Sequence, residues 1–255
     1  MPAEVRLIGL AGIGEVEEGD DVAGLILEAA AEQKTPIEEG DVLVITQKIV
    51  SKAEGRVVRL RDVQPSTIAA SLSQGSNRDP RHTEIILRES RRIVRMERGN
   101  IISETHHGFN CANAGVDASN VPGDDSVALL PVDPDASAEA VRQAVRAALG
   151  VNVAVIVSDT FGRPWREGAT NVAIGVAGMD PMADYVGRED CYGQVMRTTV
   201  IAVADELAAA AELVTGKVDG VPAVVIKGYG TGAPDLGRAR GARALIRPPE
   251  RDMFR

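Results

Sequence analysis

A carboxylate and a hydroxyl, those of Asp159 and Thr160, lie just after an apolar run of the chain, with Ser158 between. The run, residues 153–157, is rich in β-branched side chains and predicts a buried strand with these two polar groups at its C-terminal end. A rigid strand can hold such groups against a ligand, and their oxygens suit a hard cation such as Mg²⁺ or Mn²⁺. The alternative is that the pair only caps a loop, as Asp–Thr pairs commonly do.

Two arginines follow this pair. Gly162 should let the chain turn away from the strand, and Arg163 and Arg166 come next. Their guanidinium groups suit phosphate or carboxylate, and either one could neutralise charge during a reaction. The stretch as a whole predicts a metal-held phosphate site.

A second polar segment, residues 110–121, surrounds Gly115 with short side chains. Its polar members are Asn110, Asn113, Asp117, Ser119 and Asn120. Small residues let a backbone approach a ligand closely, while Asp117 offers carboxylate oxygens and Asn120 an amide. A loop that satisfies its own backbone through Asx-turns is the alternative, and composition does not separate the two.

Two other groups of polar residues admit a ligand role but have simpler explanations. Lys48 and Lys52 follow a predicted buried strand over residues 42–46, and solvated lysines are the usual explanation for such positions. His106 and His107 suggest a metal, but adjacent strand residues point to opposite faces, so we favour a non-metal role for them.

The elements that must position these groups alternate along the chain. Helices are predicted over residues 22–32, within 61–74, from Ser137 as N-cap to about Leu149 with Gly150 as its end, and over 204–214. Further strands are predicted over residues 5–10, 171–178, 195–202 and 218–227. A hairpin should join the second half of residues 84–96 to residues 100–105 through a turn at Gly99 and Asn100.

Composition narrows the function classes. The 255 residues are 44% hydrophobic but only 3% aromatic, so the core must be aliphatic and rich in alanine. A formal charge of −9 argues against a nucleic-acid surface, and no stretch resembles a membrane span or a signal segment. With only Cys111 and Cys191 present, we expect a cytoplasmic protein with reduced thiols and neither nucleic-acid nor membrane partners.

Five sequence blocks, in order along the chain, resemble the coenzyme F420-0:L-glutamate ligase family, whose members add glutamate to a deazaflavin coenzyme. The blocks are IGL from Ile8, TQKIVSKAEGR from Thr46, CANAGVDASN from Cys111, LPVDPD from Leu130 and SDTFGRPWREG from Ser158. The resemblance covers almost the whole chain. The chain resembles both the archaeal single-domain enzymes and the N-terminal half of the two-domain actinobacterial version.

The resemblance implies a nucleotide and metal assignment. Asp117 and Asp159 would share a divalent ion, Mg²⁺ or Mn²⁺, and Thr160 would lie beside a second one, with potassium as a further monovalent ion. Asp117, Asp159, Arg163 and Arg166 would form the catalytic set. The residues that the resemblance places on GTP are Leu10, Ala11, Gly12, Ile13, Gln47, Lys52, Asn120, Glu212 and Gly216. Gln47 stands where family members often carry Ser, and Lys217 departs from the expected pattern in the loop over residues 212–218.

The resemblance also implies a reaction and an architecture. GTP would phosphorylate a carboxylate of F420-0, the amine of L-glutamate would attack the acyl phosphate, and further glutamates would be added through γ-linkages. The expected fold is α+β, with two intimate subdomains of largely antiparallel or mixed sheets flanked by helices. One domain should cover residues 1–245, with a tail over 246–255, and the chain should form a homodimer.

Two other functions use the same residues. A metal-dependent nucleotide phosphohydrolase would need the acidic cluster but no amine acceptor. A non-catalytic GTP-binding module would hold nucleotide and metal without turnover. Neither explains why so many separate segments match one ligase family at once.

Overall fold

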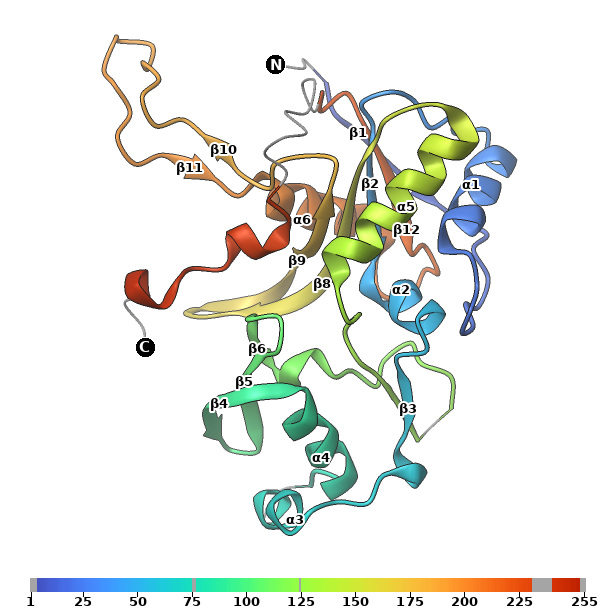
Figure 1. The fold of residues 1–255 in the computed structure, drawn as a ribbon, viewed down its shortest axis with the longest axis vertical. Helices are drawn as coiled ribbons and strands as arrows, with labels where there is room; N and C mark the ends of the chain where they lie inside the picture. Colours follow the sequence, from blue (N-terminus) through green and yellow to red (C-terminus); the bar gives the residue numbers. More distant parts are fainter. Residues whose placement is uncertain (1–3, 75–76, 124, 231–239, 253–255) are drawn as a thin grey trace.

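Five strands form the main sheet of the protein, in the order β1-β12-β2-β8-β9 (Figure 1). The computed structural model describes residues 4–74, 77–123, 125–230 and 240–252. The strands are β1 (Arg6–Leu10), β2 (Val42–Thr46), β8 (Ala154–Arg163), β9 (Arg166–Ala177) and β12 (Ala223–Lys227). Only β2 and β8 run parallel, and the other neighbours are antiparallel. The sheet is therefore mixed, as predicted.

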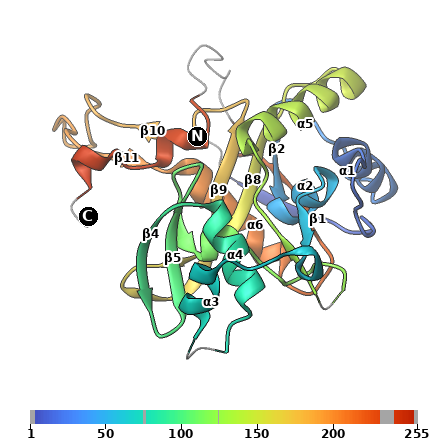
Figure 2. The same ribbon diagram turned by 60° about the horizontal axis from the view of Figure 1, so that its bottom comes forward.

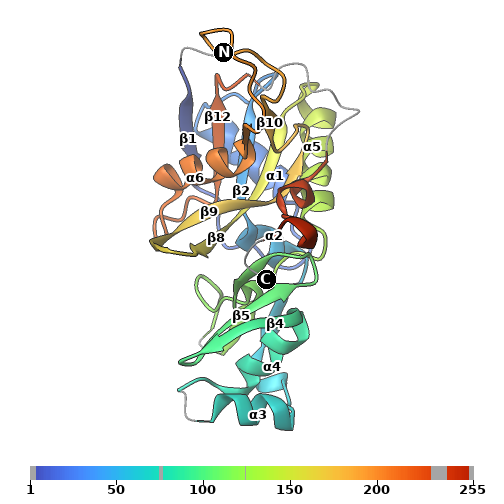
Figure 3. The ribbon, with the colours of Figure 1, turned by 90° about the vertical axis from the view of Figure 1, so that its left-hand side faces the viewer.

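Helices cover both faces of this sheet because its central strands are apolar on both sides. Leu43 and Ile45 of β2 pack toward α1 (Val22–Glu32) and α5 (Pro134–Leu149). Val42 and Val44 pack instead toward α6 (Val203–Thr215). Figure 3 shows α5 and α6 on opposite sides of the strands. We call this sheet, with α1, α5, α6 and the short helix α2 (Gln47–Ala53), the sheet body.

Residues 57–129 fold as a second part, which we call the small unit, below the sheet body in Figure 1 and in front in Figure 2. Its apolar residues form a cluster of their own, from Leu60 to Leu129. Its longer elements are α3 (Thr67–Ser73), α4 (Pro80–Glu89), β4 (Ser90–Glu97) and β5 (Asn100–Thr105). The shorter ones are β3 (Val57–Arg59), η1 (Leu60–Asp62), β6 (Asn110–Ala112), η2 (Asn113–Gly115) and β7 (Ser126–Ala128). The α+β class with two intimate parts is what the sequence predicts.

The chain enters and leaves the small unit at one place. The backbone N–H of Leu129 donates to the carbonyl oxygen of Arg56 at 2.9 Å. The Arg56 side chain donates two further hydrogen bonds, from Nε to the Leu130 carbonyl oxygen at 3.0 Å and from Nη2 to Glu89 at 2.8 Å. One arginine thus ties both chain crossings to α4.

Most predicted elements are confirmed, but the central strand is longer than predicted. We expected it to end before Asp159, with a turn at Gly162. Instead β8 continues to Arg163, because β9 pairs with it along its whole length and the turn falls at Pro164 and Trp165. Its parallel partner β2 does stop at Thr46, opposite Ser158. Asp159 is therefore the first residue of β8 beyond the edge of the parallel pair.

Other boundaries also differ from prediction. Helix α5 is N-capped by Asp133, which accepts from the backbone N–H of Ala136 at 3.0 Å, rather than by Ser137. Pro134 explains the earlier start, because proline suits the first helical position. The predicted end at Gly150 is confirmed by its left-handed φ of 74°. Strand β12 begins only at Ala223.

The region between β9 and α6 contains little regular structure. β10 (Ala183–Asp184) pairs with β11 (Val200–Ile201), and an isolated bridge joins Glu189 to Val195, so the strand predicted over residues 195–202 is mostly absent. After residue 239 the short helices η3 (Ala242–Leu245) and η4 (Pro249–Arg251) follow, and Ala242 is fully buried. In the part of the chain that the structure describes, no helix combines the length and the apolar character that crossing a bilayer requires.

Candidate functional site

A cleft of about 980 Å³ lies between the sheet body and the small unit. Its body wall comes from the loop after β1, the start of α2, the outer part of β8 and the loop after α6. Its opposite wall comes from residues 111–121 of the small unit. The two sequence segments predicted to carry the chemistry therefore face each other across one cavity.

Asp159 is the carboxylate of the body wall. It is half-buried on β8, and in the described ranges no side chain donates a hydrogen bond to it. Burial raises its pKa to about 6, the backbone N–H of Thr160 and the charge on Lys48 oppose that rise, and the charge on Asp117 adds to it. A carboxylate in this condition is stabilised by any cation that reaches it.

Asp117 is the carboxylate of the small-unit wall, where its backbone bridges to Ala128 of β7. Lys48 Nζ lies 2.8 Å from its Oδ2, and Ser119 donates to it through both its backbone N–H and its hydroxyl, at 2.8 and 2.6 Å. Burial would raise the pKa of Asp117, but these hydrogen bonds outweigh burial and lower it. Asp117 is therefore a charged, well-oriented carboxylate.

Thr160 follows Asp159 on β8 and carries the third predicted metal oxygen. Its hydroxyl donates to Asn171 Oδ1 at 2.6 Å and accepts from the ammonium group of Lys217. Lys217 also lies 3.2 Å from Glu212. The loop after α6 thus reaches the outer part of β8 through a lysine.

Two lysines of α2 enter the cleft from the same side. Lys48 and Lys52 are four residues apart, so they lie on one helical face, and both line the cavity. Lys52 Nζ lies 2.5 Å from Glu15 Oε1, and its side chain is only 9% exposed. Each lysine therefore enters the cleft already paired with a carboxylate, Asp117 for one and Glu15 for the other.

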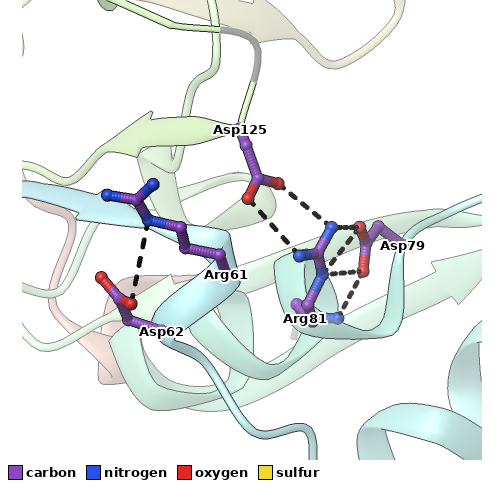
Figure 4. A network of polar contacts seen from close by, with 5 residues as sticks. All are labelled: Arg61, Asp62, Asp79, Arg81 and Asp125. Carbon is purple, nitrogen blue, oxygen red and sulfur yellow. Dashed lines mark hydrogen bonds and ion pairs between the residues drawn. The ribbon is translucent and has the colours of Figure 1, made fainter.

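The small-unit wall is held from behind by α4. Arg78, just before this helix, donates to Asn113 Oδ1 at 2.8 Å in the turn that precedes Asp117. Arg81 of α4 contacts both its N-cap, Asp79, and Asp125 near β7, as Figure 4 shows, at 2.6 and 3.1 Å. The Arg78 hydrogen bond and the Arg81 ion pairs fix the start of α4 against both ends of the loop that contains Asp117.

The structure brings most of the predicted site residues into the cleft, but not all. Those that line it are Ile13, Gln47, Lys52, Asp117, Asn120, Asp159, Thr160 and Gly216. Leu10 is fully buried in β1, and the backbone N–H of Ala11 donates to Gln33 at 3.1 Å. Neither of these two residues lines the cleft, and Gly12 does not line it either. Glu212 also lies outside the lining, where it pairs with Lys217. Their predicted contacts with nucleotide remain predictions.

Arg163 and Arg166 also lie outside the cleft lining, at the tip of the β8–β9 hairpin. The guanidinium of Arg163 is bound to its own turn, 2.8 Å from the Glu167 carbonyl oxygen and 3.2 Å from that of Gly168. The sequence predicts a turn at Gly162, but the longer hairpin carries both arginines past the cleft lining. Their catalytic role stays a prediction.

Sequence reasoning missed several cleft residues. Lys48 was judged a solvated lysine, although its spacing of four from Lys52 would place both on one face of a helix. Helix α2 itself went unrecognised because its seven residues directly follow a strand with no loop between them. Ser119 is identified only as one of the polar residues around Gly115, and Asn171 gives no signal of its own, since each acts by holding another side chain.

The two adjacent histidines have backbone partners. His106 Nε2 lies 2.8 Å from the Arg88 carbonyl oxygen, and His107 Nε2 lies 2.8 Å from that of Pro131. The His107 ring also stacks on Phe109, with centroids 5.7 Å apart. The His107–Pro131 contact joins the small unit to the segment before α5, while the other two contacts lie within the small unit.

The donor set of the cleft fits a magnesium-like ion that is completed by its ligand. Within the described residues, no three His, Cys, Asp or Glu side chains gather as a closed metal site. Asp117, Asp159 and Thr160 instead offer two carboxylates and a hydroxyl. Mg²⁺ is typically bound by one or two carboxylates together with water and substrate phosphates. The residues therefore fit such an ion only when a phosphate ligand is also present.

Comparisons with known proteins agree on the class, which is that of amide-forming ligases. Coenzyme F420:L-glutamate ligase of Methanothermobacter thermautotrophicus is 49% identical over 253 residues, which cover 98% of this chain and 99% of that protein. The protein of the same name from Methanopyrus kandleri is 48% identical, covering 94% of each chain. That of Haloarcula marismortui is 42% identical, covering 98% of this chain and 96% of its own length.

A family model described as F420-0:Gamma-glutamyl ligase matches residues 12–228. The match includes both walls of the cleft and the whole small unit. The chain belongs to the F420-0:gamma-glutamyl ligase family, as the resemblance of its sequence blocks predicts.

Proposed function

We propose that this chain joins L-glutamate to coenzyme F420-0 in a GTP-dependent reaction, and then adds further γ-linked glutamates. Its family and the names of its relatives support the ligase reaction. The observation that carries the proposal is the cleft, where three carboxylates and three lysines from both parts of the molecule line one cavity. At about 980 Å³ it is at the upper end of small-molecule sites, so it has room for more than one ligand.

The chemistry requires that a carboxylate be activated, because a carboxylate ion is a poor electrophile. We propose that an F420-0 carboxylate oxygen takes the γ-phosphoryl group of GTP, forming an acyl phosphate and releasing GDP. The glutamate amine then attacks the acyl carbon, the C–O bond to phosphate breaks, and inorganic phosphate leaves as the amine loses its proton. Both steps depend more on positioning and charge neutralisation than on a covalent enzyme intermediate.

In this proposal the chain supplies the positive charge locally, although its overall charge is −9. Lys52 and Lys217 bind phosphate oxygens from the two ends of the body wall. Asp117 and Asp159 would share one divalent cation, Mg²⁺ or Mn²⁺, and Thr160 would lie beside a second, with potassium as a further proposed ion. When bound, such ions neutralise charge on the transferring phosphoryl group. Asn120 and Gln47 offer amides to the nucleotide.

Hydroxylamine trapping tests the acyl phosphate. Hydroxylamine is a small, strong nucleophile that reacts with activated carboxyl groups, so F420-0, GTP and Mn²⁺ without glutamate should yield a hydroxamate of F420-0. With glutamate present, mass spectrometry should show one added glutamate for each GDP released. GDP release should depend on F420-0, because the cleft must keep water from the activated intermediate.

The same assay separates the alternatives. Rapid GTP hydrolysis without F420-0, and no hydroxamate when it is added, would identify a metal-dependent phosphohydrolase. GTP binding with no turnover under any of these conditions would identify a non-catalytic module. Either result would overturn the ligase proposal for this chain.

We also propose that the chain forms a homodimer. Residues 183–201 extend from the sheet body as an arm, visible beyond β10 and β11 in Figure 1. The arm exposes apolar side chains, among them Val186 at 50%, Tyr192 at 85% and Val195 at 55%. Exposed apolar groups on a projecting segment are typical of an interface. Light scattering should show a dimer that a Tyr192→Asp, Val195→Asp double variant converts to monomer.

A further inference from the structure

Lysine ammonium groups contact two of the three side chains that are proposed to bind metal ions. Lys48 Nζ lies 2.8 Å from Asp117 Oδ2, and the ammonium group of Lys217 contacts the Thr160 hydroxyl. The two lysines come from opposite ends of the body wall, α2 and the loop after α6. The proposed metal oxygens Asp117 and Thr160 thus each already have a cation of the chain itself.

Lys48 is the more firmly held of the two. Its side chain is 14% exposed, while that of Lys217 is 55% exposed. Lys48 is in the first turn of α2, which begins directly after the central strand β2, so its backbone position is fixed by the sheet. Its ammonium group also acts on Asp159, where its charge lowers the pKa against the effect of burial. One lysine therefore serves both carboxylates.

A divalent ion on Asp117 would lie within a few ångströms of this ammonium group. Like charges at that range repel each other strongly, because the effective dielectric constant of a partly buried site is only about 20. A metal that enters the cleft before nucleotide must therefore displace Lys48 or bind against this repulsion. A triphosphate changes this balance, since its oxygens accept hydrogen bonds from a displaced ammonium group and also ligate the metal.

We propose that Lys48 holds the metal position beside Asp117 until nucleotide arrives, and so makes divalent-cation binding depend on nucleotide binding. This inference rests on the proposed metal- and GTP-dependent function and adds its binding order. Metal and nucleoside triphosphate bind cooperatively, with Lys48 moving from the carboxylate to a phosphate. By thermodynamic linkage the metal raises nucleotide affinity by the same factor. Lys217 acts in the same way on Thr160, more weakly because it is exposed.

Mn²⁺ binding, measured by electron paramagnetic resonance, tests this coupling without any turnover. The free and bound ion are counted for the full-length protein with and without a non-hydrolysable GTP analogue. We expect weak binding to the wild-type protein alone and much tighter binding with the analogue. In Lys48→Met, Mn²⁺ should bind the nucleotide-free protein about tenfold more tightly, a typical size for such coupling, and the gain from the analogue should shrink by a similar factor.

Three further variants make the result specific. Lys48→Arg keeps the charge and should keep weak Mn²⁺ binding in the absence of nucleotide. Lys48→Gln removes the charge but keeps a donor for Asp117, so it should behave like Lys48→Met even if Met disturbs the fold. Lys34→Met removes the same charge at the end of α1, outside the cleft lining, and should bind Mn²⁺ as the wild type does.

The outcomes distinguish this inference from the function on which it rests. If the wild type binds Mn²⁺ with the analogue, but the folded Met and Gln variants bind it no more tightly alone, Lys48 is only a structural partner of Asp117 and the inference is wrong. If the wild type binds no Mn²⁺ even with the analogue, the proposed metal dependence itself fails. Circular dichroism and thermal melting establish that each variant is folded.

Discussion

The two walls of the cleft hold their carboxylates in opposite ways. Asp159 lies on a strand of the sheet body, where backbone pairing with β9 fixes its position. Asp117 lies in an irregular segment of the small unit, where Lys48 and Ser119 hold the carboxylate itself. Burial raises the pKa of Asp159 to about 6, whereas the hydrogen bonds on Asp117 outweigh its burial and lower its pKa.

This contrast shows two ways of preparing a ligand group. A strand can hold a carboxylate in place without any hydrogen bond to its side chain, so the group stays available to a cation. Without such hydrogen bonds, burial disfavours the ionised form of the carboxylate. Asp117 has only an isolated backbone bridge to Ala128, and its carboxylate is oriented by side-chain and backbone donors, which keep it charged. Because the two carboxylates are held in different ways, substitutions of Asp117 and Asp159 should have different effects on stability.

The largest effect should follow from Asp159→Asn. Losing one charged ligand of a divalent ion should cost about 3 kcal/mol or more of transition-state stabilisation, over a hundredfold in kcat/KM for glutamate addition. Because burial already opposes the charge of this carboxylate, the melting temperature of the Asp159→Asn variant should be equal to or above that of the wild type. Near-wild-type ligation by this variant would remove Asp159 from the site, and Asp62→Asn, on the exposed surface, serves as control.

Lys52→Ala should show which substrate the body wall holds. We expect it to weaken GTP by about 1.5–3 kcal/mol, on the scale of a charged hydrogen bond, and glutamate much less. Separate kinetic titrations of GTP and glutamate measure the difference. Equal losses for both substrates would instead indicate that the Lys52–Glu15 pair is structural.

The small-unit wall should be the more sensitive to backbone change. Gly115 has a φ of +73°, and an added Cβ would lie 2.7 Å from Leu130 Cγ. Gly115→Ala should lower the free energy of unfolding by about 1–2 kcal/mol from the left-handed conformation alone. Gly14→Ala, on the body side of the cleft with open space around it, should change little. Urea unfolding of both variants tests this, and equal stabilities would show that the turn before Asp117 is not constrained.

The smallest effect should come from Asp117→Asn on stability. It leaves Lys48 without its carboxylate, so the free energy of unfolding should fall by about 1 kcal/mol, in the direction opposite to Asp159→Asn. Activity should be lost in both variants. If both melted above the wild type, the two carboxylates would have the same kind of support and the contrast between the walls would be wrong.

Much of the fold followed from local patterns. The helices over Val22–Glu32 and Val203–Thr215, and the hairpin of β4 and β5, were predicted because periodicity and turn residues specify them locally. The length of β8 was not, because its outer half contains Gly162 and polar residues and is a strand only through pairing with β9. Tertiary pairing decided there against local signals.

The site was predictable where a residue type itself carries the chemistry. Asp117, Asp159 and Thr160 were singled out as oxygen ligands and do line one cleft. Lys48 was passed over because a lysine after a strand is usually solvated, and only the packing of α2 against the cleft buries it. Arg163 and Arg166 were expected in the cleft for their charge, but the hairpin carries them past it.

The strand order of the sheet body determines when the sheet can form during translation. β12, one of the last elements, lies between β1 and β2, two of the first. During synthesis the N-terminal strand therefore has no partner until residues 223–227 have left the ribosome, whereas the small unit needs only its own contiguous residues for its core. Domains generally form from the N-terminus during translation. Here the small unit, from the middle of the chain, can fold before the sheet body has its last strand, β12.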